Sequence, residues 1–264
     1  MDKTTVFTLQ RMKEKGEKFC CITVYDATFA RLVHAAGAET MLVGDSLGMV
    51  LQGHDSTVPV TLEHMAYHTA CAARGNRGAL LIADLPFMTY ATAQQALTGA
   101  TALMQAGAQV VKMEGGVWLS ETIHMLVERG IPVCAHLGLT PQSVNVFGGF
   151  RVQGRTPKSA KSILADAAEI QDAGASLLVL ECIPSALAAD ISEKLQIPVI
   201  GIGAGPGTDG QVLVLHDLLG LCESPPRFVE DFMTGRDSIP AALKAFVNAV
   251  KSGSYPGPRH CYTE

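Results

Sequence analysis

Polar residues of types that can do chemistry stand at the ends of short apolar runs in five separate parts of the sequence. Each residue alone has a structural explanation, such as a turn, a helix cap or a hydrogen-bonded histidine. Their shared position at run ends suggests a common function. The set comprises Asp45, Ser46, Asp84, Lys112, Glu114, His136 and Glu181.

Three of these residues, Asp45, Asp84 and Glu114, are carboxylates that a suitable fold would bring together. Like charges about 4 Å apart repel by roughly 4 kcal/mol per pair at an effective dielectric near 20. Three such carboxylates would cost on the order of the whole stability of a protein, about 5–15 kcal/mol, unless protonated or bound to a cation. Oxygen donors favour a hard cation, Mg²⁺ first and Mn²⁺ second. Zinc or cobalt would become stronger candidates if His136 were also a ligand.

Lys112 stands two residues before Glu114 in the run VVKMEGG, so in a strand both side chains point to the same face. A desolvated lysine can act as a Schiff-base nucleophile, or it can stay charged and bind a substrate carboxylate or a developing oxyanion. Neighbouring acids stabilise the ammonium form, whereas a Schiff base needs the free amine. We therefore predict a charged Lys112 that binds substrate.

Glu181 ends the apolar run SLLVLE and is separated in sequence from the other acids. A carboxylate in such surroundings suits a general base, a role typically worth about 10²–10⁴ in rate. The alternative role is a supporting partner for Lys112 or His136. We predict that Glu181 is the base.

The apolar runs that carry these residues are continuous rather than alternating, which is typical of parallel strands covered on both faces. Alanine-rich stretches between them, such as 61–75, 92–107 and 159–174, are predicted helices, and Thr61 is a predicted N-cap. The predicted strands are 19–24, 40–44, 79–84, 109–114, 131–136, 176–181, 197–203 and 211–216.

The two ends of these strands are connected differently. Helix-to-strand turns are short, with Gly37, Gly107 and Gly174 where a left-handed cap is needed. Strand-to-helix segments are long, above all 44–61 and 137–158. Short turns at one end and long loops at the other describe an α/β protein of the (β/α)8 TIM-barrel class, whose active site lies at the C-terminal strand ends.

An open doubly wound sheet is the alternative fold. Its functional residues should gather at one switch point, whereas here polar residues follow many strands. We predict a single TIM-barrel domain over residues 1–264, in which about 220–264 forms a C-terminal helical extension.

A literal G-x-G-x-x-G pattern occurs at Gly205, Gly207 and Gly210. A dinucleotide-binding loop should open a βαβ unit and be followed by an acidic residue about 20 positions on, and this context is lacking. An anion site after the seventh strand is a further alternative. We predict a tight turn.

Composition and charge limit the function classes. The formal net charge is -5 with no run of lysines or arginines, which argues against nucleic acid and anionic membranes as partners and favours small molecules. The seven cysteines form no C-x-x-C pair, so we expect reduced thiols. The charged N-terminal segment lacks the apolar core of a secretory signal, and no stretch of about 18 apolar residues occurs, so we expect a cytosolic protein.

Several blocks of residues, taken together, resemble the ketopantoate hydroxymethyltransferase family (3-methyl-2-oxobutanoate hydroxymethyltransferase) of pantothenate biosynthesis. The resemblance extends from about residue 19 to 216 and is specific because the blocks are long. The blocks are MLVGDSLGMVLQGHDSTVPVT, ADLPFMTY, VVKMEGG, HLGLTPQSVNVFGGFRVQGR, LVLECIP and PVIGIGAG.

The resemblance implies a (β/α)8 barrel that uses Mg²⁺ and transfers a one-carbon unit from 5,10-methylenetetrahydrofolate to 3-methyl-2-oxobutanoate, giving 2-dehydropantoate. It also implies a homo-oligomer, commonly a decamer. The substrate's carboxylate and keto oxygens would chelate Mg²⁺, and Glu181 would take the proton from C3. The enolate carbon would then attack the methylene group of the folate.

The site residues carry over motif by motif. The resemblance implies metal binding by Asp45, Asp84 and Glu114, substrate binding by Asp45, Ser46, Asp84 and Lys112, catalysis by Glu181, and a position near the substrate for His136. Two alternatives remain: another Mg²⁺-dependent 2-oxo-acid lyase of the same barrel superfamily, and a non-catalytic 2-oxo-acid binding protein. Folate-dependent turnover would separate all three.

Overall fold

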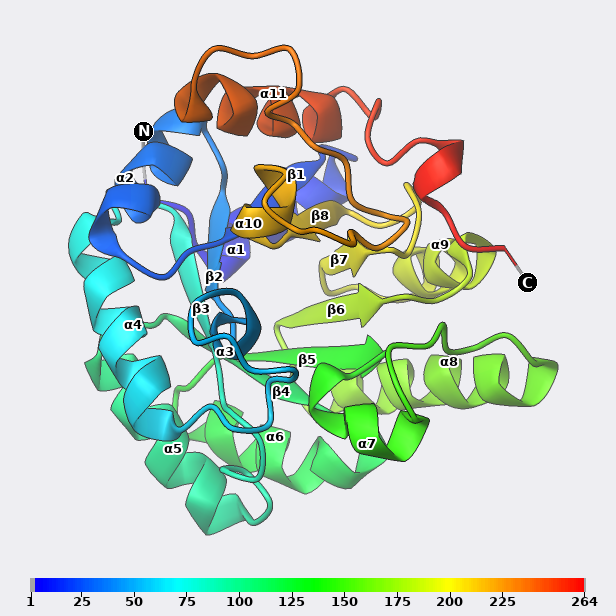
Figure 1. Cartoon of the computed structure of the whole chain (residues 1–264). Helices are drawn as coiled ribbons and strands as arrows, with labels where there is room; N and C mark the ends of the chain where they lie inside the picture. Colours follow the sequence, from blue (N-terminus) through cyan, green and yellow to red (C-terminus); the bar gives the residue numbers. More distant parts are fainter. Residues whose placement is uncertain (1–2, 264) are drawn as a thin grey trace.

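Parallel strands close into a barrel, and helices surround it, in the computed structural model, which describes residues 3–263 (Figure 1). Each strand pairs with the next in chain order, and the last pairs with the first. The strands are β1 (Phe19–Thr23), β2 (Thr40–Val43), β3 (Leu80–Asp84), β4 (Val110–Glu114), β5 (Val133–Gly138), β6 (Leu177–Glu181), β7 (Val199–Ile202) and β8 (Gly210–Leu213).

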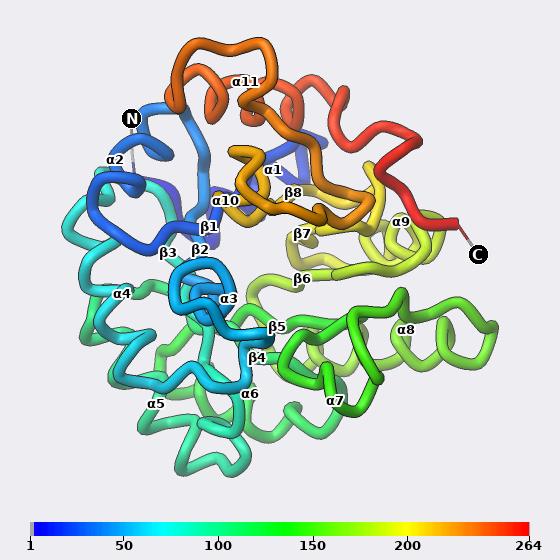
Figure 2. The backbone as a smooth tube through the Cα atoms, viewed as in Figure 1, coloured from blue at the N-terminus to red at the C-terminus, as the bar shows by residue number. Residues whose placement is uncertain are grey.

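The helices follow the path of the chain around the barrel (Figure 2). The α-helices are α1 (Val6–Glu14), α2 (Ala27–Ala36), α3 (Leu47–Val50), α4 (Leu62–Gly75), α5 (Ala93–Gln105), α6 (Ser120–Glu128), α7 (Val144–Phe147), α8 (Pro157–Asp172), α9 (Ser185–Lys194), α10 (Leu215–Leu218) and α11 (Ile239–Lys251). Short 3₁₀ turns are η1 (Val117–Leu119), η2 (Pro141–Ser143) and η3 (Pro258–His260).

The predicted (β/α)8 fold is confirmed, and its strands lie close to the predicted ranges. β5 and β7 begin directly after Pro132 and Pro198, because a proline has no N–H to donate to the ladder. β8 ends at Leu213, earlier than predicted, because the apolar residues after it form α10. Thr61 caps α4 by accepting a hydrogen bond from the His64 N–H, as predicted.

Eight side chains, one from each strand, fill the barrel interior, where alternate strands contribute to successive layers. Seven of them are uncharged and one, from β4, is a lysine. They are Cys21, Leu42, Ile82, Lys112, Cys134, Val179, Ile200 and Val212. The Lys112 side chain therefore lies inside the barrel and also lines the cavity at the strand ends.

The connection from β7 to β8 has no helix, unlike the expected eight repeated βα units. Residues 203–209 instead run back along α9 in close contact with it. A Cβ atom on Gly205 would stand 2.4 Å from Ser185 Cβ, and one on Gly207 would stand 2.6 Å from Ala189 Cβ. The glycine pattern therefore serves a tight backbone path, as predicted, and the missing side chains make room for the helix.

The C-terminal segment completes the ring of helices. α11 packs beside α2 and against β1, in the position of a barrel's eighth helix, and α10 lies across the barrel end (Figure 1). The buried face of α11 includes Leu243, Phe246 and Val250. No helix among residues 3–263 is long and apolar enough to cross a membrane.

We predict that Gly205→Ala destabilises the protein by about 2–4 kcal/mol, because it combines a left-handed backbone with a clash against α9. Gly205 has φ +78°. Gly235→Ala is the matched control: Gly235 has φ +73° but no atom within 4 Å of the added methyl group, so it should cost only about 1–2 kcal/mol. Urea unfolding of both variants measures the difference, and equal losses would show that the approach to α9 is unimportant.

Candidate active site

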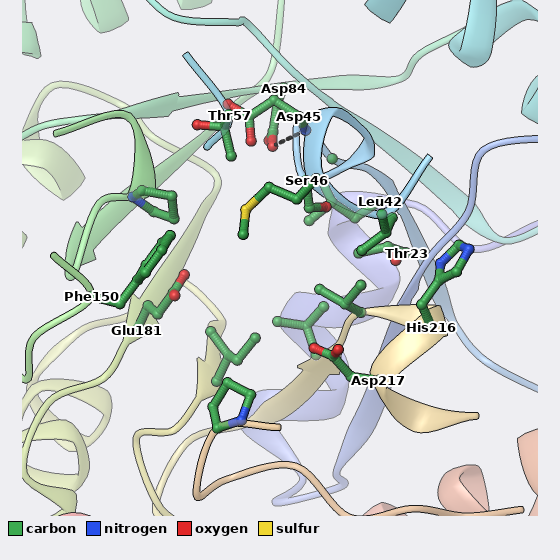
Figure 3. Close-up of a pocket in the computed structure, with 18 of the residues that line it drawn as sticks. Thr23, Leu42, Asp45, Ser46, Thr57, Asp84, Phe150, Glu181, His216 and Asp217 are labelled. Carbon is green, nitrogen blue, oxygen red and sulfur yellow. Dashed lines mark hydrogen bonds between the residues drawn. The ribbon is translucent and has the colours of Figure 1, made fainter. Parts of the chain in front are cut away.

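A cavity of about 710 Å³ opens at the C-terminal ends of the strands (Figure 3). Its lining brings together every polar residue that the sequence analysis selected, from five different strands or the turns after them. These are Asp45, Ser46, Asp84, Lys112, Glu114, His136 and Glu181. The closed barrel explains this convergence, since it places all strand ends on one rim.

Lys112 forms its closest ion pair with Asp84, at 2.8 Å between Nζ and Oδ1, while Glu114 Oε1 is 3.6 Å away. Asp84 and Lys112 are paired across β3 and β4, and both side chains are buried. Burial disfavours the ammonium ion, but the surrounding carboxylates outweigh it and raise the pKa of Lys112. The charged form is stabilised, which argues against Schiff-base chemistry.

His136 lies between two carboxylates. Its Nδ1 is 3.3 Å from Glu114 Oε1 and its Nε2 is 3.3 Å from Glu181 Oε2, although neither nitrogen is aligned for a hydrogen bond. Burial and a nearby lysine oppose a positive charge, but Glu114 and Glu181 outweigh them and raise the pKa of His136 to about 9. His136 therefore favours the imidazolium form, with one carboxylate near each ring nitrogen.

Asp45 is the carboxylate that is least well compensated. Burial and the nearby charges of Asp84 and Glu114 raise the pKa of Asp45 well above its ordinary value. Its backbone N–H donates to Asp84 Oδ2 at 3.0 Å, so the two carboxylates face each other at the cavity wall (Figure 3). This corner of the cavity strongly favours additional positive charge.

Charge balance among the seven strand-end residues named above gives the same result. Four carboxylates face two cations, which leaves two negative charges when all groups are ionised. The carboxylates are those of Asp45, Asp84, Glu114 and Glu181, and the cations are Lys112 and His136. A divalent cation would neutralise this excess.

No group of three or more histidine, cysteine or acidic side chains among residues 3–263 already has the arrangement of a metal site. Asp45 and Asp84 are neighbouring oxygen donors in an electronegative corner, which suits a hard cation. All three acids already have partners: Asp84 binds Lys112 and the Asp45 N–H, and Asp45 Oδ2 accepts from Gln142. Glu114 Oε2 accepts from the Gln142 N–H at 3.0 Å, and its Oε1 faces Lys112 and His136.

Gln142 and Tyr90 form hydrogen bonds that hold the acidic residues in place, although no sequence pattern singled them out. Gln142 Nε2 donates to Asp45 Oδ2 at 2.8 Å and to the Leu85 carbonyl at 3.0 Å, and the Tyr90 hydroxyl donates to Gln142 Oε1. All of these groups are buried. Gln142 belongs to the TPQS stretch that contributes to the family resemblance, so the sequence did mark this segment. Its role could not be predicted, because an amide side chain in a long loop can have many structural roles.

A hydrogen-bond chain connects Ser46 to α10 at the end of the barrel. The Tyr25 hydroxyl lies 2.9 Å from Ser46 Oγ and donates to Thr23 Oγ1 at 2.9 Å. Thr23 Oγ1 in turn accepts from the Leu215 N–H at 2.9 Å, at the start of α10. Ser46 and α10 are thereby fixed relative to each other.

The cavity wall opposite Asp45 and Asp84 was not predicted from the sequence either. His216 and Asp217 of α10 line the cavity there (Figure 3), among apolar side chains that include Val214, Leu221 and Phe228. Sequence reasoning assigned 211–216 to a strand, because a run of valine and leucine does not reveal a four-residue helix.

Comparison with known proteins gives a consistent family match. The model of the family described as ketopantoate hydroxymethyltransferase matches residues 3–258. The 3-methyl-2-oxobutanoate hydroxymethyltransferase 2 of Pseudomonas fluorescens is 58% identical over 265 residues and is covered in full, as is this chain. The 3-methyl-2-oxobutanoate hydroxymethyltransferase of Shewanella amazonensis is 57% identical, over 99% of this chain and 100% of that protein.

Solved structures with the same fold are much more distant in sequence. A phosphoenolpyruvate phosphomutase from Streptomyces platensis has a TM-score of 0.62 at 15% identity, covering 81% of this chain and 82% of that one. A 2,3-dimethylmalate lyase, a PEP mutase/isocitrate lyase superfamily member, has a TM-score of 0.58 at 18% identity, with 81% and 79% covered. These similarities show that the chain shares the barrel fold of these proteins.

We predict that Gln142→Leu destabilises the protein by about 1–3 kcal/mol, because it removes the side-chain donor to the buried Leu85 carbonyl and to Asp45 Oδ2. Gln94→Leu, on the exposed face of α5, is the control and should stay within about 0.5 kcal/mol of the wild type. Urea unfolding gives both values. Equal stability of the two variants would remove Gln142 as a support of the acidic corner.

Proposed function

The chain belongs to the ketopantoate hydroxymethyltransferase family, and we propose that its rim cavity carries out the family's reaction by enolising a bound 2-oxo acid. Its activity is that of a 3-methyl-2-oxobutanoate hydroxymethyltransferase, in pantothenate biosynthesis. The observation that carries the mechanism is the buried excess of negative charge around Asp45, across a cavity that Glu181 also lines.

Mg²⁺ is the proposed ion, with Asp45 and Asp84 as direct ligands and Glu114 as the third. Support comes from the two uncompensated negative charges and from the raised pKa of Asp45. Glu114 must exchange one of its present partners to reach the ion. When bound, the ion would polarise the substrate's keto group and make its C3 proton more acidic.

Lys112 and Ser46 are the proposed donors to 3-methyl-2-oxobutanoate. The Lys112 ammonium group can bind the substrate carboxylate or offset the charge that develops on the keto oxygen. Ser46 offers a hydroxyl whose position is set by Tyr25. Both groups are already oriented before substrate binds, which lowers the cost of ordering them in the transition state.

Glu181 is the proposed base that removes the C3 proton. Its side chain is 15% exposed, and it lines the cavity beside Phe150 (Figure 3). His136 has the role of a positioning residue, because its Nε2 lies 3.3 Å from Glu181 Oε2 and can orient that carboxylate.

The one-carbon donor is proposed to be 5,10-methylenetetrahydrofolate. The C3 carbon of the enolate would bond to the methylene carbon of the folate, whose two C–N bonds break, and water would supply the hydroxyl group of 2-dehydropantoate. The two folate nitrogens would take up the proton removed by Glu181 and the second proton of the water, and tetrahydrofolate would leave. The folate therefore has to reach the cavity that already holds the 2-oxo acid.

A homo-oligomer, specifically a decamer, is also proposed, in the cytosol. Large apolar side chains are exposed on the single chain, among them Phe7, Trp118 and Val146, at 70%, 58% and 86%. Exposed apolar surface of this kind is covered in many protein–protein interfaces. Light scattering after size exclusion tests the proposal, and a monomer at micromolar concentration would contradict it.

We predict that Glu181→Gln lowers deuterium uptake at C3 of 3-methyl-2-oxobutanoate in D₂O with Mg²⁺ by about 10²–10⁴-fold, because the amide cannot accept the proton. Proton NMR of the substrate follows the exchange without any folate. Glu193→Gln changes an exposed carboxylate on α9 and is the matched control. Wild-type exchange in Glu181→Gln, with Mg²⁺ binding intact, would exclude Glu181 as the base.

A further inference from the structure

The cavity is much larger than the 2-oxo acid requires. A molecule of about eight non-hydrogen atoms occupies roughly 150 Å³, whereas pockets for drug-sized ligands hold about 300–1,000 Å³. The cavity measures about 710 Å³. Most of its space thus lies outside the acidic corner, toward α10 and the segment that follows it.

That second region has the composition of a ligand site. Its walls are apolar and include Val212, Val214, Leu221 and Phe228, while His216 and Asp217 supply polar groups. Figure 3 shows His216 and Asp217 across the cavity from Asp45 and Asp84. A mostly apolar pocket with a few fixed polar groups is typical of a site for a planar organic ring.

Asp217 is the polar group of this wall that a ligand could engage. Its carboxylate is largely buried with Cys222 as a side-chain hydrogen-bond partner, and burial raises the pKa of Asp217 to about 6. A buried carboxylate with so few partners would be stabilised by a ligand that donates hydrogen bonds to it. His216 Nδ1 has no partner among the described residues, but that atom is itself fully buried.

The backbone holds these groups in place. The Leu215 N–H donates to Thr23 Oγ1, and the His216 ring lies 5.8 Å from the Tyr25 ring, centroid to centroid. Since Tyr25 also contacts Ser46, the α10 end and the 2-oxo-acid end share one rigid frame.

We propose that the cavity end formed by Val214, His216 and Asp217 binds the reduced pterin ring of the folate co-substrate, with the Asp217 carboxylate accepting from the ring's 2-amino-4-oxopyrimidine edge. The assignment rests on the proposed function, which requires a folate donor in this cavity. That edge presents two parallel N–H groups, which match a carboxylate in a bidentate pair.

The inference is tested by measuring tetrahydrofolate binding and C3 exchange on the same variants. Isothermal titration with tetrahydrofolate, in the presence of Mg²⁺ and 3-methyl-2-oxobutanoate, should show at least tenfold weaker binding in Asp217→Asn. Val214→Phe, which fills the apolar end, should weaken it similarly. Glu223→Gln, an exposed carboxylate in the same segment that does not line the cavity, is the control and should bind as the wild type does.

C3 exchange separates this inference from the proposed function, because exchange needs no folate. Asp217→Asn and Val214→Phe should exchange C3 within about twofold of the wild type while losing folate-dependent turnover at low folate concentration. Wild-type tetrahydrofolate affinity in both variants would overturn the pterin assignment. Equal losses of exchange and folate binding would overturn it too, since the residues would then serve the 2-oxo acid. Failure of exchange in the wild type would instead contradict the proposed enolisation.

Discussion

The structure depends on how buried negative charge is balanced at the barrel rim. Closing the barrel brings the carboxylates of Asp45, Asp84 and Glu114 into one cavity, and only Lys112 and His136 offset them within the described chain. Desolvated like charges are unfavourable, so such a cluster reduces the stability of the free protein. A site with this cost is typical of function, and a bound cation would supply the charge that the fold lacks.

The rest of the molecule keeps these groups in place. Lys112 lies in the barrel interior, and its ammonium group pairs with Asp84. Gln142, in the turn after β5, donates a hydrogen bond to Asp45. Tyr25 links Ser46, through Thr23, to the start of α10. Because these side chains are held in place, they do not have to rearrange when charge develops on a bound molecule.

Much of this arrangement could be predicted from the sequence, and the failures have physical causes. Continuous apolar runs revealed the strands and hence which polar residues reach the rim, including Glu181. Alternation within one strand could not reveal that Lys112 pairs with Asp84 rather than Glu114, because that contact depends on the register of β3 against β4. Gln142 and α10 lie in segments whose paths are set by tertiary hydrogen bonds, which leave no periodic signal in the sequence.

The most direct test of the account is the response of unfolding to Mg²⁺ in the wild type and in Asp45→Asn. If the buried carboxylate is retained for a cation, Asp45→Asn should be more stable than the wild type in the presence of a chelator. Mg²⁺ with 3-methyl-2-oxobutanoate should raise the unfolding midpoint of the wild type by mass action and leave that of the variant nearly unchanged. A variant that is less stable without metal, or that gains as much from Mg²⁺ as the wild type, would contradict the account.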